Sequence, residues 1–369
     1  MLTLPPLALY IHYPWCVKKC PYCDFNSHEK GDKTNYISTL LKDLDNDLNY
    51  IQGRSIHSIF IGGGTPSLMS ADELSELFIG LKSRLTFDQD IEITLETNPG
   101  TFEIEKFKQF RDIGINRLSI GVQSFHDKHL QSLGRIHSAD EAIHACEQAR
   151  KVGFDNFNID LMYGLEAQTI DECLADVNQA INLSPSHISF YQLTIEPNTL
   201  FAKYPPILPQ DDELWQMGKQ GAALLEKNGF VQYEVSAYGK SSSIHNLNYW
   251  QFGDYLGIGA GAHGKITNID TGQILRTIKP KSPKDYIDNQ KESIELVNNL
   301  SFEFMLNALR LKQGFNSKLF TDRTGQSIDT IRTQLQKAQS IGLLKISKTK
   351  IEPTKKGFDF LNDLQAYFL

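Results

Sequence analysis

Short apolar segments alternate with helical hydrophobic patterns over the first half of the chain. Between 36 and 51, apolar residues recur every three or four positions, which is typical of an amphipathic helix. Ser70 stands before Asp72, Glu73 and an apolar run, which predicts that a helix begins there. Similar helical patterns cover 103–112, 139–151 and 170–182. The predicted strands are rich in Ile, Leu, Val and Phe and are bounded by Gly, Pro or polar turns: 7–11, 56–61, 91–96, 117–122, 157–162 and 188–193.

This alternation of βα units predicts an α/β fold built on a parallel sheet with right-handed crossovers. The sheet is expected to be open or curled into a partial (β/α)6 barrel, in which the functional site lies at the carboxyl ends of the strands. We therefore expect the polar and glycine residues at those ends to share one site. They are the cysteine-containing segment after the first strand, Gly62 to Pro66, Glu96, Gln123, Asp160, and Gln192 with Thr194.

The chain changes character after Asn198. The pattern over 211–228 predicts a helix, whereas 233–264 is rich in Gly and Tyr without clear periodicity, and 271–290 is polar and indicates a linker or an irregular strand. Helices over 302–311 and 328–340, a hairpin of 343–347 and 350–353, and a last helix to Phe368 resemble a winged-helix module. We expect three domains: a barrel over 1–200, an α+β extension over 201–295 and a winged-helix-like domain over 296–369.

Composition narrows the class of protein. The 369 residues are 40% hydrophobic and 22% charged, as in a soluble globular protein. No apolar run approaches the roughly 20 residues that a transmembrane helix needs, and the first residues, 1–6, lack the features of a signal peptide. The chain has only five cysteines, three of them clustered, so a disulfide scaffold is excluded and a cytoplasmic protein is expected.

Charge is distributed unevenly along the chain. The net charge is −7, which argues against nucleic-acid binding by the chain as a whole. The segment 301–369 nevertheless carries 11 Lys and Arg against 6 Asp and Glu. This excess supports a separate C-terminal module, and nucleic-acid binding by a winged helix is a weaker reading, because the excess is modest.

The most informative motif is the C-x3-C-x2-C run of Cys16, Cys20 and Cys23. Thiolates are soft ligands that suit iron–sulfur clusters or zinc, and Lys18 and Lys19 favour the thiolate form. A [4Fe–4S] cluster normally has four thiolate ligands, so three would leave one iron open to a reacting ligand. The alternatives are a zinc site with His12 or His28 as fourth ligand, or buried structural thiols. Cys146 and Cys173 are expected to be small buried side chains on helices.

An open iron needs a ligand that brings its own amine and carboxylate, and S-adenosylmethionine (SAM) has both. The cysteine loop, with Tyr22 before its last cysteine, resembles the radical SAM superfamily, in which the reduced cluster cleaves SAM to a 5′-deoxyadenosyl radical. The segments 10–23, 62–66, 117–124 and 158–165 are similar to oxygen-independent coproporphyrinogen III oxidase and its relatives.

This resemblance implies which residues contact SAM. They are Tyr10, Tyr22, Gly63, Gly64, Thr65, Glu96, Gln123, Arg135, Asp160 and Thr194. Gln123, Arg135, Asp160 and Thr194 match contacts of a second SAM molecule that the oxidase holds. From the residues alone, Glu96 and Asp160 could equally be ion-pair partners, Arg135 a solvated helix charge and Gln123 an interior polar residue.

Two departures separate the chain from the oxidase. The oxidase has a further cysteine two residues after its last cluster ligand, where this chain has Phe25, and it has a longer segment before the cluster. The motif H-N-x-x-Y-W, here 245–250, marks instead the haem chaperone group of the family. An imidazole is a natural axial ligand of haem iron, and Tyr249 and Trp250 offer flat faces to a macrocycle. His245 is therefore the candidate haem ligand and His263 a weaker one; the alternative is that His245 is a hydrogen-bonded interior residue.

The sequence thus predicts a haem chaperone that carries a [4Fe–4S] cluster and SAM, binds haem and passes it to an acceptor protein. The alternative function is oxidative decarboxylation of coproporphyrinogen III. The resemblance also implies an electron donor such as a flavodoxin or ferredoxin, and no nucleic-acid partner. It leaves peripheral contact with a membrane open.

Overall fold

A curved parallel sheet forms the centre of the molecule. The computed structural model describes residues 1–289 and 292–369. Every predicted strand of the barrel is present, within a few residues of its expected bounds, and the strands pair in chain order, all parallel. They are β1 Leu7–Tyr13, β2 Ile56–Gly63, β3 Phe87–Thr97, β4 Arg117–Gln123, β5 Phe157–Tyr163 and β6 His187–Gln192. The predicted α/β fold with a partial barrel is therefore confirmed.

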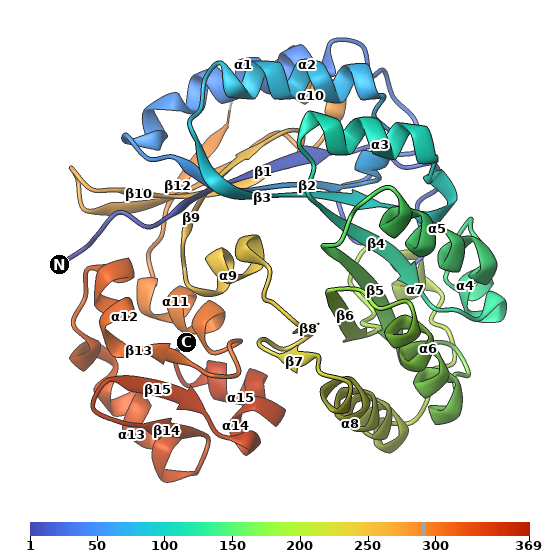
Figure 1. Ribbon diagram of the computed structural model, residues 1–369. Coiled ribbons are helices and arrows are strands. Elements are labelled where there is room, and N and C mark those ends of the chain that lie inside the picture. Colours follow the sequence, from blue (N-terminus) through green and yellow to red (C-terminus); the bar gives the residue numbers. More distant parts are fainter. Residues whose placement is uncertain (290–291) are drawn as a thin grey trace.

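Helices cover the convex face of this sheet (Figure 1). They are α1 Tyr36–Asp47, α2 Ala71–Lys82, α3 Ile104–Ile113, the short α4 Asp127–Ser132, α5 Ala139–Lys151 and α6 Ile170–Asn182. Ser70, Ser138 and Thr169 each form a capping box with the glutamate three residues later, which fixes where α2, α5 and α6 begin. The apolar side chains of strands and helices form one continuous core.

The sheet continues beyond the six units at both edges. On one side β9 Asp254–Ile258 pairs parallel with β1, followed by antiparallel β10 His263–Asn268, β11 Gln273–Ile278 and β12 Ser293–Leu296. On the other side β8 Ala237–Gly239 and β7 Val231–Gln232 extend β6 antiparallel. The sheet therefore has two separate ends, β12 and β7, and does not close into a complete barrel within the described residues.

The region between these strands is more regular than the sequence suggested. The helix predicted over 211–228 is α8 Asp211–Lys227, and α7 Leu200–Lys203 precedes it. The segment without clear periodicity contains α9 Ile244–Trp250, which lies on the concave side of the sheet and contacts β2 (Figure 1). The stretch 271–290, expected to be a linker or an irregular strand, contains the strand β11 and the helix α10 Pro283–Asp288. The strand alternative is therefore confirmed for 273–278, whereas the helix was not expected; residue 290 lies outside the described residues. Antiparallel pairing with β10, not the sequence pattern, makes 273–278 a strand.

The C-terminal segment builds a separate apolar cluster around Phe304. Its helices are α11 Leu300–Ala308, α12 Ser317–Thr324, α13 Arg332–Ser340, α14 Lys355–Asp359 and α15 Leu361–Ala366. The predicted hairpin is β14 Leu344–Ile346 with β15 Lys350–Pro353, and the two-residue β13 Phe315–Asn316 joins it. The three domain boundaries stay a prediction, and residues 290 and 291 of the second predicted domain lie outside the described residues.

The C-terminal segment contacts the molecule near both ends of the curved sheet. Near β7, Arg310 and Lys312 pair with Glu234 and Glu226 at 3.1 and 2.6 Å. Near β11, Glu303 of α11 pairs with Arg276. The segment thus spans the open side of the barrel, as Figure 1 shows. In the described part of the chain, no helix has the length and apolar character needed to cross a membrane.

Candidate cluster and cofactor site

The cysteine loop follows β1 and is held in place by backbone hydrogen bonds. The amide of Cys16 donates to the carbonyl of His28 at 3.0 Å, and the amide of His28 donates to the carbonyl of Pro14 at 2.7 Å. The ammonium of Lys19 donates to the carbonyl of Phe25 at 2.9 Å. Cys16 is buried, while Cys20 and Cys23 are partly exposed, and all three are free thiols. Backbone hydrogen bonds therefore fix the loop, and none of its three thiols is used in a disulfide.

The three thiols fit an iron–sulfur cluster better than a single metal ion. Burial raises the pKa of the Cys16 and Cys23 thiols, and the neighbouring cysteines raise it further, as expected for thiols that lie near one another without a cation. Among the described residues, no three His, Cys, Asp or Glu side chains converge closely enough to hold one ion. Both ring nitrogens of His12 are engaged, with the Tyr10 hydroxyl at 2.9 Å and the Asn26 carbonyl at 2.8 Å. A zinc site with His12 as fourth ligand is therefore not supported.

The glycine run after β2 brings the second loop against the cysteine loop. The amides of Gly64 and Thr65 donate to the carbonyls of Tyr13 and Trp15, both at 2.7 Å. A β-carbon on Gly64 would lie 2.4 Å from the Trp15 carbonyl oxygen, closer than any side chain tolerates. Gly63 has a φ of 117°, and a β-carbon there would meet the His12 ring at 2.6 Å. Only glycine allows this approach, so the run positions the cluster loop.

Two buried carboxyls lie at the ends of neighbouring strands. Glu96 of β3 accepts the amide of Gly63 at 3.0 Å. Burial, with the nearby Asp160, raises the pKa of Glu96 to about 8. Burial also raises the pKa of Asp160, which accepts hydrogen bonds from Ser119 and Asn158 at 3.1 and 2.8 Å. Neither carboxyl forms an ion pair with a described residue, so the ion-pair alternative is wrong for both, and the pair favours a cationic ligand.

Arg135 reaches the cluster loop from the turn after α4. One guanidinium nitrogen lies 3.8 Å from the Cys20 sulfur and the other donates to the Gly121 carbonyl at 2.5 Å. Burial lowers its pKa, but Tyr22 and Cys20 outweigh burial, so the pKa of Arg135 stays above its ordinary value. Its Nε is buried and has no partner among the described residues. Arg135 is thus no solvated helix charge.

Gln123, at the end of β4, is held in an unusual backbone conformation. Its φ is 73°, in the left-handed region that non-glycine residues rarely adopt. Its side-chain oxygen accepts the Tyr191 hydroxyl at 2.8 Å, and the residue is buried. A strained backbone of this kind is retained where the surroundings fix a side chain for a task. Thr194, by contrast, is exposed just beyond β6.

An open cavity of about 860 Å³ lies against this edge of the sheet. It is lined by Tyr10, Gly63 and Glu96 of the predicted SAM residues and by the cluster cysteine Cys23. The other predicted SAM residues do not line it: Tyr22, Gly64, Thr65, Gln123, Arg135, Asp160 and Thr194. The cavity also reaches residues that the sequence did not assign to the site: Asn26, Tyr255 and Lys281. Asn26 and Tyr255 lie close to a motif in the sequence, whereas Lys281 has no such signal.

The predicted haem ligand His245 is an interior residue of α9. Its Nδ1 lies 3.0 Å from the Ser58 hydroxyl and its Nε2 lies 3.1 Å from the Tyr249 hydroxyl. Burial, with His57 and Arg117 nearby, lowers its pKa to about 3. Its backbone amide donates to Glu92 at 3.0 Å. The hydrogen-bonded interior alternative thus describes His245 in this structure, whereas Tyr249 of the same motif lines the cavity.

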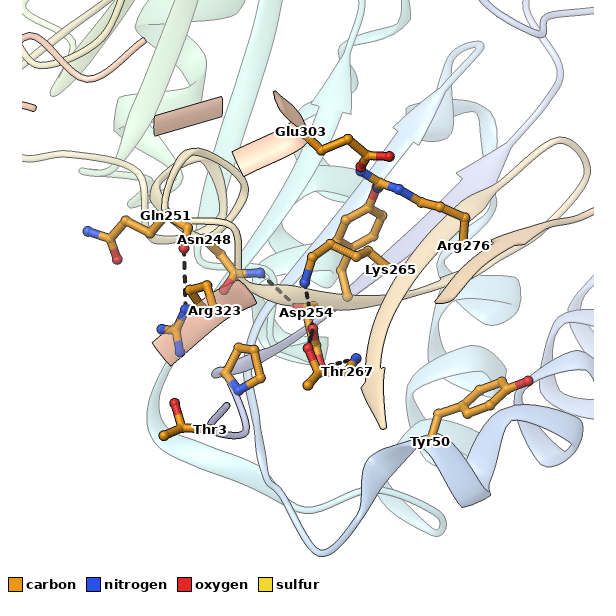
Figure 2. A network of polar contacts seen from close by, with 12 residues as sticks. Thr3, Tyr50, Asn248, Gln251, Asp254, Lys265, Thr267, Arg276, Glu303 and Arg323 are labelled. Carbon is orange, nitrogen blue, oxygen red and sulfur yellow. Dashed lines mark hydrogen bonds and ion pairs between the residues drawn. The ribbon is translucent and has the colours of Figure 1, made fainter. Parts of the chain in front are cut away.

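A buried polar network holds the end of α9 (Figure 2). Asp254 accepts Arg54 at 2.7 Å, Lys265 at 2.8 Å and the amide and hydroxyl of Thr267 at 2.8 and 2.9 Å. The Asn248 side chain donates to the Asp254 carbonyl at 2.8 Å. Burial alone would raise the pKa of Asp254, but Lys265 and Arg54 hold it below its ordinary value. The network fixes the motif helix to β9 and β10.

The same helix end contacts the C-terminal segment. Arg323 of α12 donates to the Gln251 carbonyl at 3.3 Å, and Figure 2 shows this contact beside the Asp254 network. The guanidinium of Arg310 lies 4.3 Å from the ring centre of Trp250, the last residue of the motif. One face of the Trp250 ring is therefore a packing surface for the C-terminal segment.

Comparison with known proteins agrees with this site. Residues 10–180 match the family model of the radical SAM superfamily, and residues 298–360 match that of the HemN C-terminal domain. The chain is 50% identical over 379 residues to the heme chaperone HemW of Escherichia coli (strain K12), with all of both chains covered. It is also 50% identical over 382 residues to the heme chaperone HemW of Haemophilus influenzae, covering 100% of this chain and 99% of the relative.

A solved structure shares the fold. Coproporphyrinogen III oxidase (HemN) from Escherichia coli superposes with a TM-score of 0.82, covering 99% of this chain and 90% of the oxidase. The two chains are 20% identical, so this likeness establishes a common architecture.

Proposed function

This chain belongs to the HemW family of haem chaperones within the radical SAM superfamily, and we propose that it binds haem and passes it to an acceptor protein. The observation that carries the proposal is the 50% identity to HemW proteins over the whole chain. The arrangement of the cavity supports it, because one open cleft adjoins both the cysteine loop and the H-N-x-x-Y-W helix.

Cys16, Cys20 and Cys23 would hold a [4Fe–4S] cluster and leave one iron for SAM. When bound, the cluster supplies an electron for reductive cleavage of SAM, so a flavodoxin or ferredoxin would be the electron donor. Glu96, at the cavity wall, would accept the ammonium of SAM and lose its proton as that cation arrives. The Gly63 region would approach the same ligand by its backbone, because no side chain stands in the way.

The group around Arg135 has a different task in this proposal. Gln123, Arg135 and Asp160 match the contacts of a second SAM in the oxidase, and here they lie beyond the cavity lining. Arg135 places a positive charge beside the Cys20 sulfur, which would favour the reduced, more negative cluster. Thr194 remains a predicted contact at the exposed end of β6.

His245 stays the predicted haem residue of the motif, and the structure supports an indirect role for it. Iron could reach an imidazole nitrogen of His245 only after a hydrogen bond to Ser58 or Tyr249 is broken. With the fold as it stands, His245 fixes the hydroxyl of Tyr249, whose ring lies at the cleft.

The oxidase alternative lacks a supporting observation of its own. The structural likeness to coproporphyrinogen III oxidase concerns the fold. At the position where the oxidase family has a further cysteine, this chain exposes Phe25, with 59% of its surface accessible. A phenyl group offers neither a proton nor a metal ligand for porphyrinogen chemistry.

The proposal is tested with anaerobically reconstituted protein that carries its cluster. Titration with haem should give a Soret band that saturates at one haem per chain. The haem-loaded protein should then transfer haem to apomyoglobin. Incubation with coproporphyrinogen III, reductant and SAM should give no protoporphyrinogen. Absence of haem binding at micromolar concentration would refute the chaperone function, and porphyrinogen turnover would establish the alternative.

A further inference from the structure

We propose that His263 is the axial ligand of the haem iron and that the macrocycle lies in the cleft beside the cysteine loop. The inference rests on the proposed function and names the residue and the surface that function would use. His263 is the first residue of β10, its side chain is exposed, and it lines the cavity together with Cys23, Phe25 and Tyr249.

His263 differs from the other histidines of the cleft in that its imidazole is uncommitted. His12 uses both ring nitrogens on Tyr10 and Asn26, and His28 has its Nε2 at 3.3 Å from the Asn26 side-chain oxygen. No described residue hydrogen-bonds the ring of His263. A nitrogen lone pair that faces a cavity and has no partner is what an axial ligand of haem requires. The porphyrin itself supplies four nitrogens to haem iron, so one protein ligand suffices and the lack of a three-ligand ion site among the described residues is no objection.

Aromatic rings beside His263 form a wall whose orientation is already set. Tyr249 and Tyr255 line the cavity with ring centres 4.6 Å apart and planes at 80°. Arg276 donates to the Tyr255 hydroxyl at 2.9 Å, and His245 holds the Tyr249 hydroxyl at 3.1 Å. Phe25 lines the same cavity and is well exposed. The two tyrosine rings, fixed by their hydroxyls, can contact a flat apolar macrocycle without losing side-chain freedom on binding.

Lys281 provides a cation for a haem propionate. Its side chain is exposed, it lines the cleft, and it forms no ion pair with a described residue. The ammonium of Lys19 is less available, because it donates to the carbonyls of Phe25 and Ser27. Asp24 and Glu196 also line the cleft and would repel carboxylates. The propionates are therefore expected on the Lys281 side of the bound haem.

Haem bound at His263 would lie on segments that are hydrogen-bonded to the cysteine loop. The Asn26 side chain donates to the carbonyls of Ala260 and Lys281, both at 2.8 Å. These two bonds join the end of the cysteine loop to the segment that precedes His263 and to the segment that follows β11. A ligand bound through His263 would thus contact residues that are hydrogen-bonded to the cysteine loop.

The test compares His263→Ala with His144→Ala, which removes an exposed histidine of α5 far from the cleft in the chain. Both variants are reconstituted with the cluster and titrated with haem, and spectra are taken against the haem-free holoprotein. His263→Ala should weaken haem binding by roughly 10- to 100-fold or more, as for the loss of a metal-site interaction. It should also abolish the iron–histidine stretching band of the ferrous haem complex in resonance Raman spectra, and added imidazole should restore such a band in haem that stays bound to the protein on gel filtration. His144→Ala should behave as the wild type.

The outcomes separate the two proposals. Failure of the wild-type holoprotein to bind haem refutes the proposed function itself. If the wild type binds haem and His263→Ala keeps the same affinity and the same iron–histidine band, the axial-ligand assignment is overturned. It is equally overturned if His28→Ala removes the band while His263→Ala retains it. Return of the band with imidazole in the protein-bound haem of His263→Ala supports direct ligation, because a folding defect would not respond to a free ligand.

Discussion

Replacing Glu96 with glutamine should remove a pH dependence of stability that this one carboxyl imposes on the cluster-free protein. Burial, with Asp160 nearby, raises the pKa of Glu96 to about 8 from an ordinary value of 4.5. At pH 7 the folded protein therefore holds a proton that the unfolded chain has released. Stability from this group is fully present below pH 4.5 and is lost as the pH rises through 8.

The size of the effect follows from these two pKa values. Between pH 6 and pH 8, proton linkage at Glu96 lowers the free energy of unfolding by about 2 kcal/mol. Glutamine is neutral at both pH values and can still accept the Gly63 amide, which the carboxyl accepts at 3.0 Å. The variant should thus match the wild type near pH 6 and exceed its stability near pH 8.

The assay is urea unfolding of the reduced, cluster-free protein at pH 6 and pH 8, followed by circular dichroism. Glu76→Gln, on the exposed face of α2, is the matched control and should keep the pH dependence of the wild type. The reasoning would be refuted if Glu96→Gln and the wild type lost the same stability between the two pH values.

Three further changes test the supports of the site. Asp254→Asn leaves buried Lys265 without its carboxylate, so the free energy of unfolding should fall by about 3–5 kcal/mol in chemical denaturation; a loss below 1 kcal/mol would contradict the network. Gly64→Ala forces a β-carbon against the Trp15 carbonyl and should cost about 1–3 kcal/mol while lowering the iron bound on reconstitution; unchanged iron content would argue against the glycine requirement. Asn26→Ala removes two hydrogen bonds and should accelerate amide exchange in 16–28 and 259–263 together, measured by mass spectrometry; acceleration in one segment alone would show that they are not joined.

The barrel could be predicted from the sequence because each of its strands and helices has a signal in its own short segment. Each strand is a short apolar run, and helix starts such as Ser70 carry a capping box that the structure reproduces. The carboxyl ends of parallel strands meet by geometry, so Glu96 and Asp160 could be placed near each other without a structure. The cysteine spacing indicated the cluster because it, too, is a local property of the sequence.

The rest depends on contacts between distant parts of the chain. Nothing in the glycine-rich run before His263 indicates that β9 pairs with β1, or that Asn26 joins that region to the cysteine loop. The motif around His245 was recognisable, yet only the fold shows that its imidazole faces Ser58 and Tyr249. Burial of a histidine is a tertiary property, and a motif does not reveal which of its side chains reaches a cavity.

The contact of the C-terminal segment near both ends of the sheet has a mechanical consequence. An incomplete barrel bends more easily than a closed one, because no ring of hydrogen bonds fixes its circumference. Here the ion pairs Arg310–Glu234 and Glu303–Arg276 link the C-terminal segment to the two sides of the sheet and limit changes in its curvature. A protein that binds the C-terminal segment and shifts it would therefore alter the width of the cleft from a distance.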